Sequence, residues 1–140
     1  MNTVLDTNVI SELEGRKHSG HLLGWLNRFQ RQELFLTTVS VAEIRYGLSL
    51  LPDGNRRDGI TASYSRIEEG FVGRILAFSL DAARRYGELK AHRQKIGRPM
   101  ETKDAMIAAI CLSHGATLAT RNVKDFEGLD LGLVNPFEGA

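Results

Sequence analysis

The sequence has little of what would place it among secreted or membrane proteins. It contains one cysteine, Cys111, in 140 residues, so no disulfide can form within the chain, and this suits a reducing cytoplasm. Asp6 and Glu12 interrupt the start of the chain, which therefore lacks the apolar core of a secretory signal. No apolar run approaches the roughly 18–20 residues that a membrane span needs. We therefore expect a cytoplasmic protein with no membrane partner.

Charge of one sign and nucleotide-binding loops are also missing. The 18 Lys and Arg residues nearly balance the 17 Asp and Glu residues, for a net charge of +1. This balance is not typical of a protein that grips nucleic acid by charge alone, but it does not exclude a nuclease with acids in a cleft and basic residues around it. The sequence also has no Walker-type glycine loop, GxSxG motif or dinucleotide fingerprint.

What the sequence does contain fits one globular domain. The 42% of apolar residues and 25% of charged residues allow a hydrophobic core without disulfides or a structural metal. No repeat, low-complexity tract or linker divides the chain. We therefore expect a single domain over residues 1–140.

Predicted strands alternate with predicted helices along the whole chain. The apolar runs indicate strands at 3–5, 33–37, 73–78, 117–120 and 131–134, and helices at about 9–14, 19–30, 41–51, 56–69, 79–96 and 102–114. This alternation predicts an α/β fold with a central parallel sheet of about four to five strands and helices on both faces. In such a sheet, functional groups gather beyond the carboxyl ends of the strands.

Several acids occupy positions where they could meet at that edge. Asp6 ends the first strand, Glu43 lies on the helix after the second, and Asp104 lies in the first turn of a helix whose next eight residues are apolar. Asn122 and Asp125 follow the fourth strand. Converging carboxylates repel one another unless a proton or a cation lies between them. Oxygen ligands of this kind suit Mg²⁺, with Mn²⁺ as the alternative, and the matching chemistry is phosphodiester hydrolysis.

Each of these residues also has a purely structural explanation. Ser40 and Glu43 match a capping box at a helix start, and Asp104 could complement a helix dipole. Asp6 could be only an N-cap, and Asn122 with Asp125 could cap a short helical turn. The joint pattern, rather than any single acid, favours a catalytic site.

The sequence around these residues resembles a known family. The relevant blocks are VLDTNVISEL at 4–13, VSVAEIRYG at 39–47, KDAMIAA at 103–109, LATRN at 118–122 followed by Asp125 and Phe126, and VNPF at 134–137. In this order and spacing they resemble the VapC-type PIN-domain ribonuclease toxins, especially their FitB-like branch. The resemblance covers essentially the whole chain.

This resemblance implies a PIN fold and an acidic metal site that cleaves single-stranded RNA with a metal-activated water. It implies that Asp6, Glu43 and Asp104 are the principal acids, and that the partners are a cognate antitoxin and a second copy of the chain. Many relatives carry Asp where this chain has Asn122, so either Asp125 supplies the fourth charge or a second metal binds weakly.

Other roles and other functions are compatible with the same sequence. Thr7 and Thr120 could orient a ligand or a water beside the acids, although capping and strand roles account for them equally well. The alternative functions are a catalytically weak PIN module that binds an antitoxin and operator complex, and another Mg²⁺ enzyme such as a phosphatase or a DNA nuclease. A rim that contacts phosphate could be formed by basic residues near the acids: Arg45, Arg93, Lys95, Arg98, Lys103 and Arg121.

Overall fold

The computed structural model describes residues 2–15 and 20–138, which contain a five-stranded parallel sheet. Its strands are β1 (Thr3–Leu5), β2 (Leu34–Thr37), β3 (Ile75–Leu76), β4 (Thr117–Ala119) and β5 (Leu133–Val134). They lie in the order β3-β2-β1-β4-β5, and every pairing between neighbours is parallel. The prediction of an α/β fold on a parallel sheet is therefore confirmed.

The helices occupy the segments between the strands. They are α1 (Thr7–Glu14), α2 (Gly20–Leu26), α3 (Thr38–Leu50), α4 (Asn55–Gly70), α5 (Leu80–Lys95) and α6 (Thr102–Ser113), with short 3-10 turns η1 (Arg31–Glu33) and η2 (Val123–Phe126). The expected start of the second helix at Ser19 lies outside the described residues. That helix ends at Leu26 rather than at Gln30, because Gln30 and Glu33 form a capping box that starts η1.

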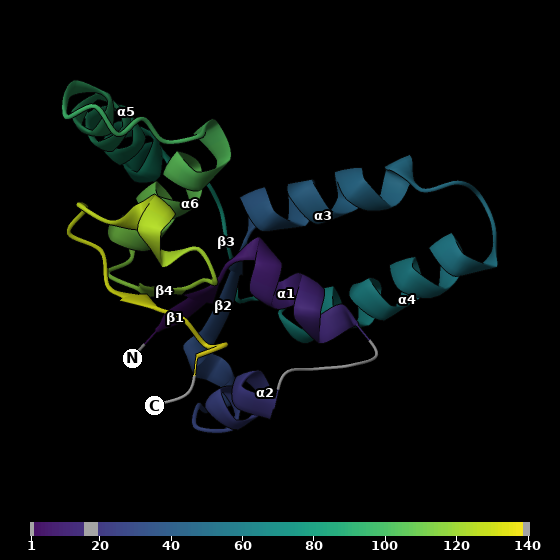
Figure 1. The fold of residues 1–140 in the computed structure, drawn as a ribbon. Helices are drawn as coiled ribbons and strands as arrows, with labels where there is room; N and C mark the ends of the chain where they lie inside the picture. The colour runs from purple at the N-terminus through teal and green to yellow at the C-terminus, as the bar shows by residue number, and fades with distance from the viewer. Residues whose placement is uncertain (1, 16–19, 139–140) are drawn as a thin grey trace.

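The core has two halves, one on each face of the sheet. Val4 and Leu5 are both fully buried but point to opposite faces, as neighbours in a strand must. Val4 packs in the half covered by α5 and α6, and Leu5 packs in the half covered by α1, α2, α3 and α4. Figure 1 shows these two groups of helices on either side of the strands, with α3 and α4 forming a hairpin that extends away from the sheet. Helices on both faces were predicted from the sequence.

The start of α3 rules out one structural explanation that the sequence allowed for Glu43. Thr37 is the N-cap of α3, and its hydroxyl accepts a hydrogen bond from the Ser40 amide at 3.1 Å, so Ser40 lies inside the helix. The alternative explanation of Ser40 and Glu43 as a capping box is therefore wrong, which leaves the Glu43 carboxylate available for other contacts. Glu101 is the N-cap of α6.

The strand order places the end of β1 at the centre of the molecule. The chain leaves β1 toward β2 on one side, whereas β4 pairs with β1 on the other side. Such a reversal of strand order opens a crevice at the carboxyl ends of the strands, where α/β proteins bind their ligands. Asp6 and Thr120 directly follow β1 and β4, so both lie at this crevice. No helix of the described residues is both long and apolar enough to cross a membrane.

Candidate active site

Asp6 is held at the crevice by hydrogen bonds to both oxygens of its carboxylate. Its side chain is 5% exposed. Oδ1 accepts a hydrogen bond from the Thr7 amide at 2.8 Å, and Oδ2 accepts one from Thr120 Oγ1 at 2.7 Å. Burial raises the pKa of Asp6, the bonds from Thr120 and Thr7 oppose this, and the charges of Glu43 and Asp125 raise the pKa further. Asp6 is therefore the N-cap of α1, as one of the sequence interpretations proposed. It also lies close enough to other acids for their charges to raise its pKa.

Glu43 reaches the same place from α3. Its Oε1 accepts a hydrogen bond from Thr7 Oγ1 at 3.0 Å, and its Oε2 lies 3.0 Å from Lys103 Nζ. Thr7 thus links the two acids, because its amide binds Asp6 and its hydroxyl binds Glu43. Its predicted place beside the acids is confirmed.

Asp104 enters from the first turn of α6. Burial is the largest cause that raises its pKa to about 6, followed by the charges of Asp6, Asp125, Glu101 and Glu43. A carboxylate that merely complemented a helix dipole would not be surrounded by four other acids. The charges of these acids therefore act on Asp104 in addition to its burial.

Asn122 and Asp125, the two candidates for the fourth metal-binding position, make different contacts. The Asn122 backbone caps η2, with its carbonyl accepting from the Asp125 amide at 3.0 Å, and its side chain makes no capping hydrogen bond. Asp125 lines a hollow of about 450 Å³ together with Asp104, and its charge acts on both Asp104 and Asp6. Of the two residues, Asp125 is therefore the one that adds negative charge to the cluster.

The donor chemistry fits a hard divalent cation, although the acids are not arranged as a finished metal site. In the described part of the chain, no group of three His, Cys, Asp or Glu side chains could hold a metal ion as it stands. Burial and neighbouring acids nevertheless raise the pKa of both Asp6 and Asp104, and a cation between these carboxylates would favour their charged forms. Mg²⁺ and Mn²⁺ take oxygen ligands of this kind and keep several of their waters, so a few carboxylates suffice.

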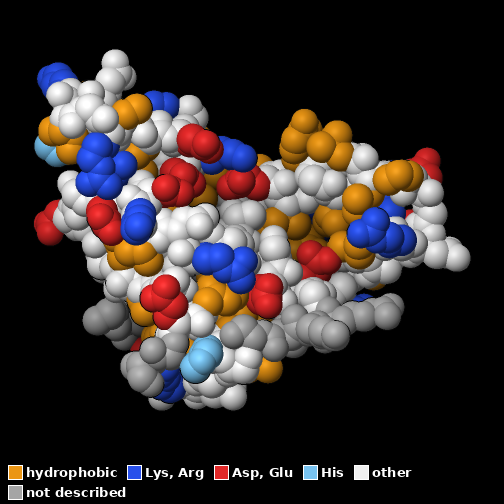
Figure 2. Space-filling model, viewed as in Figure 1, with side chains coloured by type: hydrophobic (Ala, Val, Ile, Leu, Met, Phe, Trp, Pro, Cys, Tyr) orange, Lys and Arg blue, Asp and Glu red, His pale blue; other side chains and the backbone are white. Residues whose placement is uncertain are grey.

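The predicted basic rim is only partly present. Lys103 lies beside Glu43, and Arg121 lies at the edge of the crevice with its guanidinium 3.9 Å from the Phe137 ring. Arg45 is engaged by Glu68 at 3.1 Å, and Arg93 is buried, 4% exposed. The expectation that Arg93 contacts phosphate is therefore wrong. Figure 2 shows acidic and basic side chains interspersed where the α5–α6 layer meets the α3–α4 hairpin.

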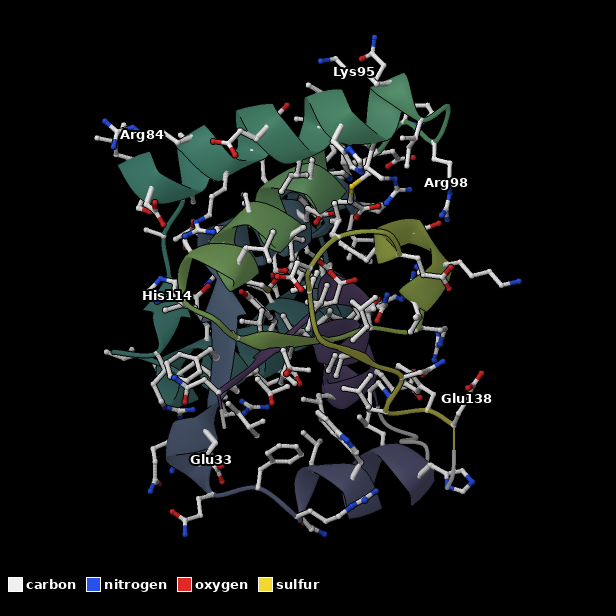
Figure 3. All side chains as sticks on the ribbon, turned by 90° about the vertical axis from the view of Figure 1, so that its left-hand side faces the viewer. Glu33, Arg84, Lys95, Arg98, His114 and Glu138 are labelled. Carbon is white, nitrogen blue, oxygen red and sulfur yellow. The ribbon has the colours of Figure 1, made fainter. Side chains whose placement is uncertain are left out.

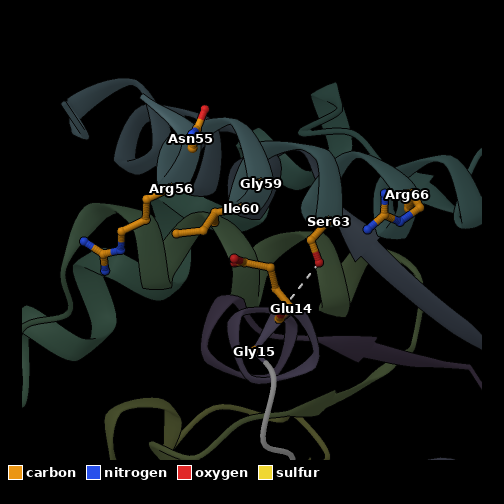
Figure 4. Close-up of a pocket in the computed structure, with 8 residues that line it drawn as sticks. All are labelled: Glu14, Gly15, Asn55, Arg56, Gly59, Ile60, Ser63 and Arg66. Atoms are coloured by element: carbon orange, nitrogen blue, oxygen red, sulfur yellow. Dashed lines mark hydrogen bonds between the residues drawn. The ribbon is translucent and has the colours of Figure 1, made fainter. Parts of the chain in front are cut away.

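A larger hollow lies elsewhere and does not belong to this site. It has a volume of about 670 Å³ between α1 and α4, and Glu14 and Gly15 line it at the far end of α1 from Asp6 (Figure 4). Arg56 and Arg66 of α4 also line it. Its size alone would suggest a binding site, but the acids lie at the other end of the helix.

The PIN domain family matches residues 3–130 of this chain. The chain belongs to the PIN-domain family. The plasmid stability protein StbB of Pseudomonas syringae is 40% identical to this PIN domain over 96% of the chain and 98% of its own length. The VapC ribonuclease Y4jK of Sinorhizobium fredii is 39% identical over 98% of the chain and 99% of its own length.

Solved structures agree with this assignment. The structure of FitAB bound to an IR36 DNA fragment contains a chain that superposes on this PIN domain with a TM-score of 0.91. The two are 30% identical, and the alignment covers 99% of this chain and 97% of that one. The resemblance to VapC-type and FitB-like toxins that the motifs indicated is therefore confirmed.

Proposed function

We propose that this PIN domain is a metal-dependent endoribonuclease, the toxin of a type II toxin–antitoxin system, which cleaves phosphodiester bonds of single-stranded RNA. The observation that carries the proposal is that Thr7 links Asp6 to Glu43 and that the charges of Asp6, Glu43 and Asp125 all act on Asp104. The relatedness to a VapC ribonuclease over nearly the whole chain supports it.

In this proposal, Asp6, Asp104 and Asp125 hold Mg²⁺ or Mn²⁺, with Glu43 beside them. The bound ion would supply Lewis acidity and a water of lowered pKa. Thr120 and Thr7 fix the direction of the Asp6 carboxylate through bonds of 2.7 and 2.8 Å. Thr7 also orients Glu43, and Lys103 next to it can place a cation near an RNA phosphate.

The proposed partners follow from the relatives. The FitAB structure is a complex bound to DNA, which supports a cognate antitoxin as the protein partner of this chain. A homodimer is part of the same proposal. Exposed apolar side chains on α3, namely Tyr46 and Leu50, are available for such contacts.

Cleavage of a total-RNA pool and a single-stranded DNA pool tests the function. Mg²⁺, Mn²⁺ and a chelator are compared for the wild type, for Asp104→Asn and for Asp58→Asn, a control that removes an exposed acid from α4. We expect metal-dependent cleavage of RNA by the wild type and the control, and a loss of at least about a hundredfold in Asp104→Asn.

The same experiment distinguishes the ribonuclease from the main alternative function. Asn122 carries no charge, which keeps open the alternative of a catalytically weak PIN module that acts mainly as a binding partner in an antitoxin–operator complex. Tight antitoxin binding without metal-stimulated cleavage of any RNA would support that module. Hydrolysis of a small phosphomonoester, or preference for DNA, would point instead to a different Mg²⁺ enzyme.

A further inference from the structure

Arg93 buries a permanent positive charge in an unusual way. It lies in the last turn of α5 and is 4% exposed. Among the described residues, its guanidinium pairs with no carboxylate and donates only to backbone carbonyls. Burying a charge is costly unless every donor finds a partner, so the contacts of this side chain need an explanation.

The contacts of Arg93 converge on the segment that carries Asp125. Nη1 donates to the carbonyls of Asp125 at 3.2 Å and Glu127 at 2.9 Å, on either side of Phe126. Nε donates to the carbonyl of Arg98 at 2.8 Å, which fixes the turn after α5 to the same group. One guanidinium thus ties the end of η2 to the end of α5.

Neighbouring residues complete this attachment. Phe126 is 1% exposed and packs in the core half that contains α5 and α6. Arg98 donates from Nη2 to the Lys124 carbonyl at 3.3 Å, and Figure 3 shows Arg98 beside η2 at the end of α5. The backbone around Asp125 is therefore held from the core by Phe126 and from α5 by Arg93.

The contacts between Arg93 and η2 lie next to the acids of the proposed site. Arg93, Asp104 and Asp125 line the same hollow of about 450 Å³. Asp125 lies on a short 3-10 turn, which has few hydrogen bonds of its own to fix its position. Contacts from outside the turn therefore help to fix the direction of the Asp125 carboxylate.

We propose that Arg93 is a positioning residue, which holds η2 so that the Asp125 carboxylate faces Asp104 and Asp6 in the metal site. The inference rests on the proposed function, because it assumes that Asp125 helps to hold a cation. Arg93 acts through backbone carbonyls and touches neither metal nor RNA. The planar fork of an arginine can reach these carbonyls together, whereas a lysine offers one compact, strongly hydrated ammonium group.

Calorimetric titration of the full chain with Mn²⁺ tests this inference without relying on catalysis. The variants are Arg93→Met, Arg93→Lys, Asp125→Asn and the double variant Arg93→Met/Asp125→Asn. Leu89→Ala is the matched control, because it removes buried volume from α5 one turn earlier without removing a donor to η2. Thermal unfolding of each variant is followed in parallel.

We expect Arg93→Met and Arg93→Lys to weaken Mn²⁺ binding by about tenfold, as is usual when a residue that supports a ligand is lost. Leu89→Ala should lower the melting temperature but leave Mn²⁺ affinity within about twofold, because only the core is affected. In the Asp125→Asn background, Arg93→Met should have no further effect on affinity.

Three results would overturn the inference. The inference fails if both Arg93 variants bind Mn²⁺ as tightly as the wild type does. It also fails if Arg93→Met lowers Mn²⁺ affinity equally in the wild-type and Asp125→Asn backgrounds. If Arg93→Met does not fold, Arg93→Lys decides, and failure of both to fold would show a role in stability alone. A wild-type chain that binds no Mn²⁺ would instead refute the metal site on which the proposed function depends.

Discussion

The two central acids of the site, Asp6 and Asp104, occupy environments that differ in kind. Asp6 is almost fully buried, but the Thr7 amide and the Thr120 hydroxyl stabilise its charged form. Asp104 is only half-buried, yet its pKa rises to about 6 because burial and four neighbouring acids all act in the same direction. The more buried carboxylate is thus better supported than the less buried one.

The difference shows how the fold divides two tasks. The end of β1 provides a fixed carboxylate, positioned by the backbone of α1 and by β4. The start of α6 adds a carboxylate whose repulsion is relieved only when a proton or a cation arrives. Burial raises the pKa of both acids, but only Asp6 has hydrogen bonds that offset part of this effect.

Of the substitutions that test this difference, replacing Asp6 should have the largest effect on stability. In the metal-free protein, Asp6→Ala removes the cap of α1 and leaves the buried Thr120 hydroxyl without its acceptor. We expect the free energy of unfolding to fall by about 2 kcal/mol. Urea unfolding with a chelator present measures it, and an unchanged midpoint would show that the hydrogen bonds of Asp6 do not stabilise the fold.

Replacing Asp104 should change the free energy of unfolding in the opposite direction. The folded-state pKa of about 6 lies above the ordinary 3.8, so the charged form disfavours folding, and wild-type stability is lost as the pH rises through 6. Asp104→Asn should raise the free energy of unfolding by about 1 kcal/mol at pH 7.5, after allowance for solvent screening. The gain should vanish below about pH 4.

Urea unfolding of Asp104→Asn at both pH values, without metal, measures this gain. Asp58→Asn serves as the control, because it removes an exposed acid far from the cluster. A destabilised Asp104→Asn protein at pH 7.5 would mean that the carboxylate makes a favourable contact and that the contrast with Asp6 does not hold.

The smallest effect concerns the ion pair between Lys103 and Glu43, whose N–O distance is 3.0 Å. Lys103 is exposed, so the pair contributes at most about 1 kcal/mol, but its ammonium group competes with a divalent cation for Glu43. Lys103→Met should therefore tighten Mn²⁺ binding by at most about fivefold, measured by calorimetry. Lys95→Met, at the end of α5, is the control, and weaker Mn²⁺ binding in Lys103→Met would contradict the expected competition.

The sequence was sufficient for the parts of the fold that depend on local patterns. The alternation of apolar runs predicted all five strands, and the helix predicted at about 79–96 corresponds to α5, which is followed by Gly97 with a φ of +77°. Asp6 and Asp104 were identifiable because one ends a buried strand and the other begins an apolar helix. Each of these predictions depends only on residues that are close together in the sequence.

Features that depend on distant contacts were not predictable in the same way. Thr37 competes with Ser40 for the start of α3, and the outcome depends on where β2 ends in the sheet. Arg93 resembled a surface cation because its partners, the carbonyls of Asp125 and Glu127, lie 32 and 34 residues further along the chain. Side-chain donors to backbone carbonyls leave no pattern in a sequence.

The pairing of the central strands has a consequence for synthesis on the ribosome. Thr120 binds Asp6 across 114 residues, and Asp125 follows still later in the chain. Contacts between such distant segments form late, because the intervening chain must first be made and closed into a loop. A nascent chain that has emerged only as far as α5 therefore contains Asp6 and Glu43 but neither Asp104 nor β4. If the chain cleaves RNA as proposed, it becomes active only after the segment that carries Asp104, Thr120 and Asp125 has been synthesised.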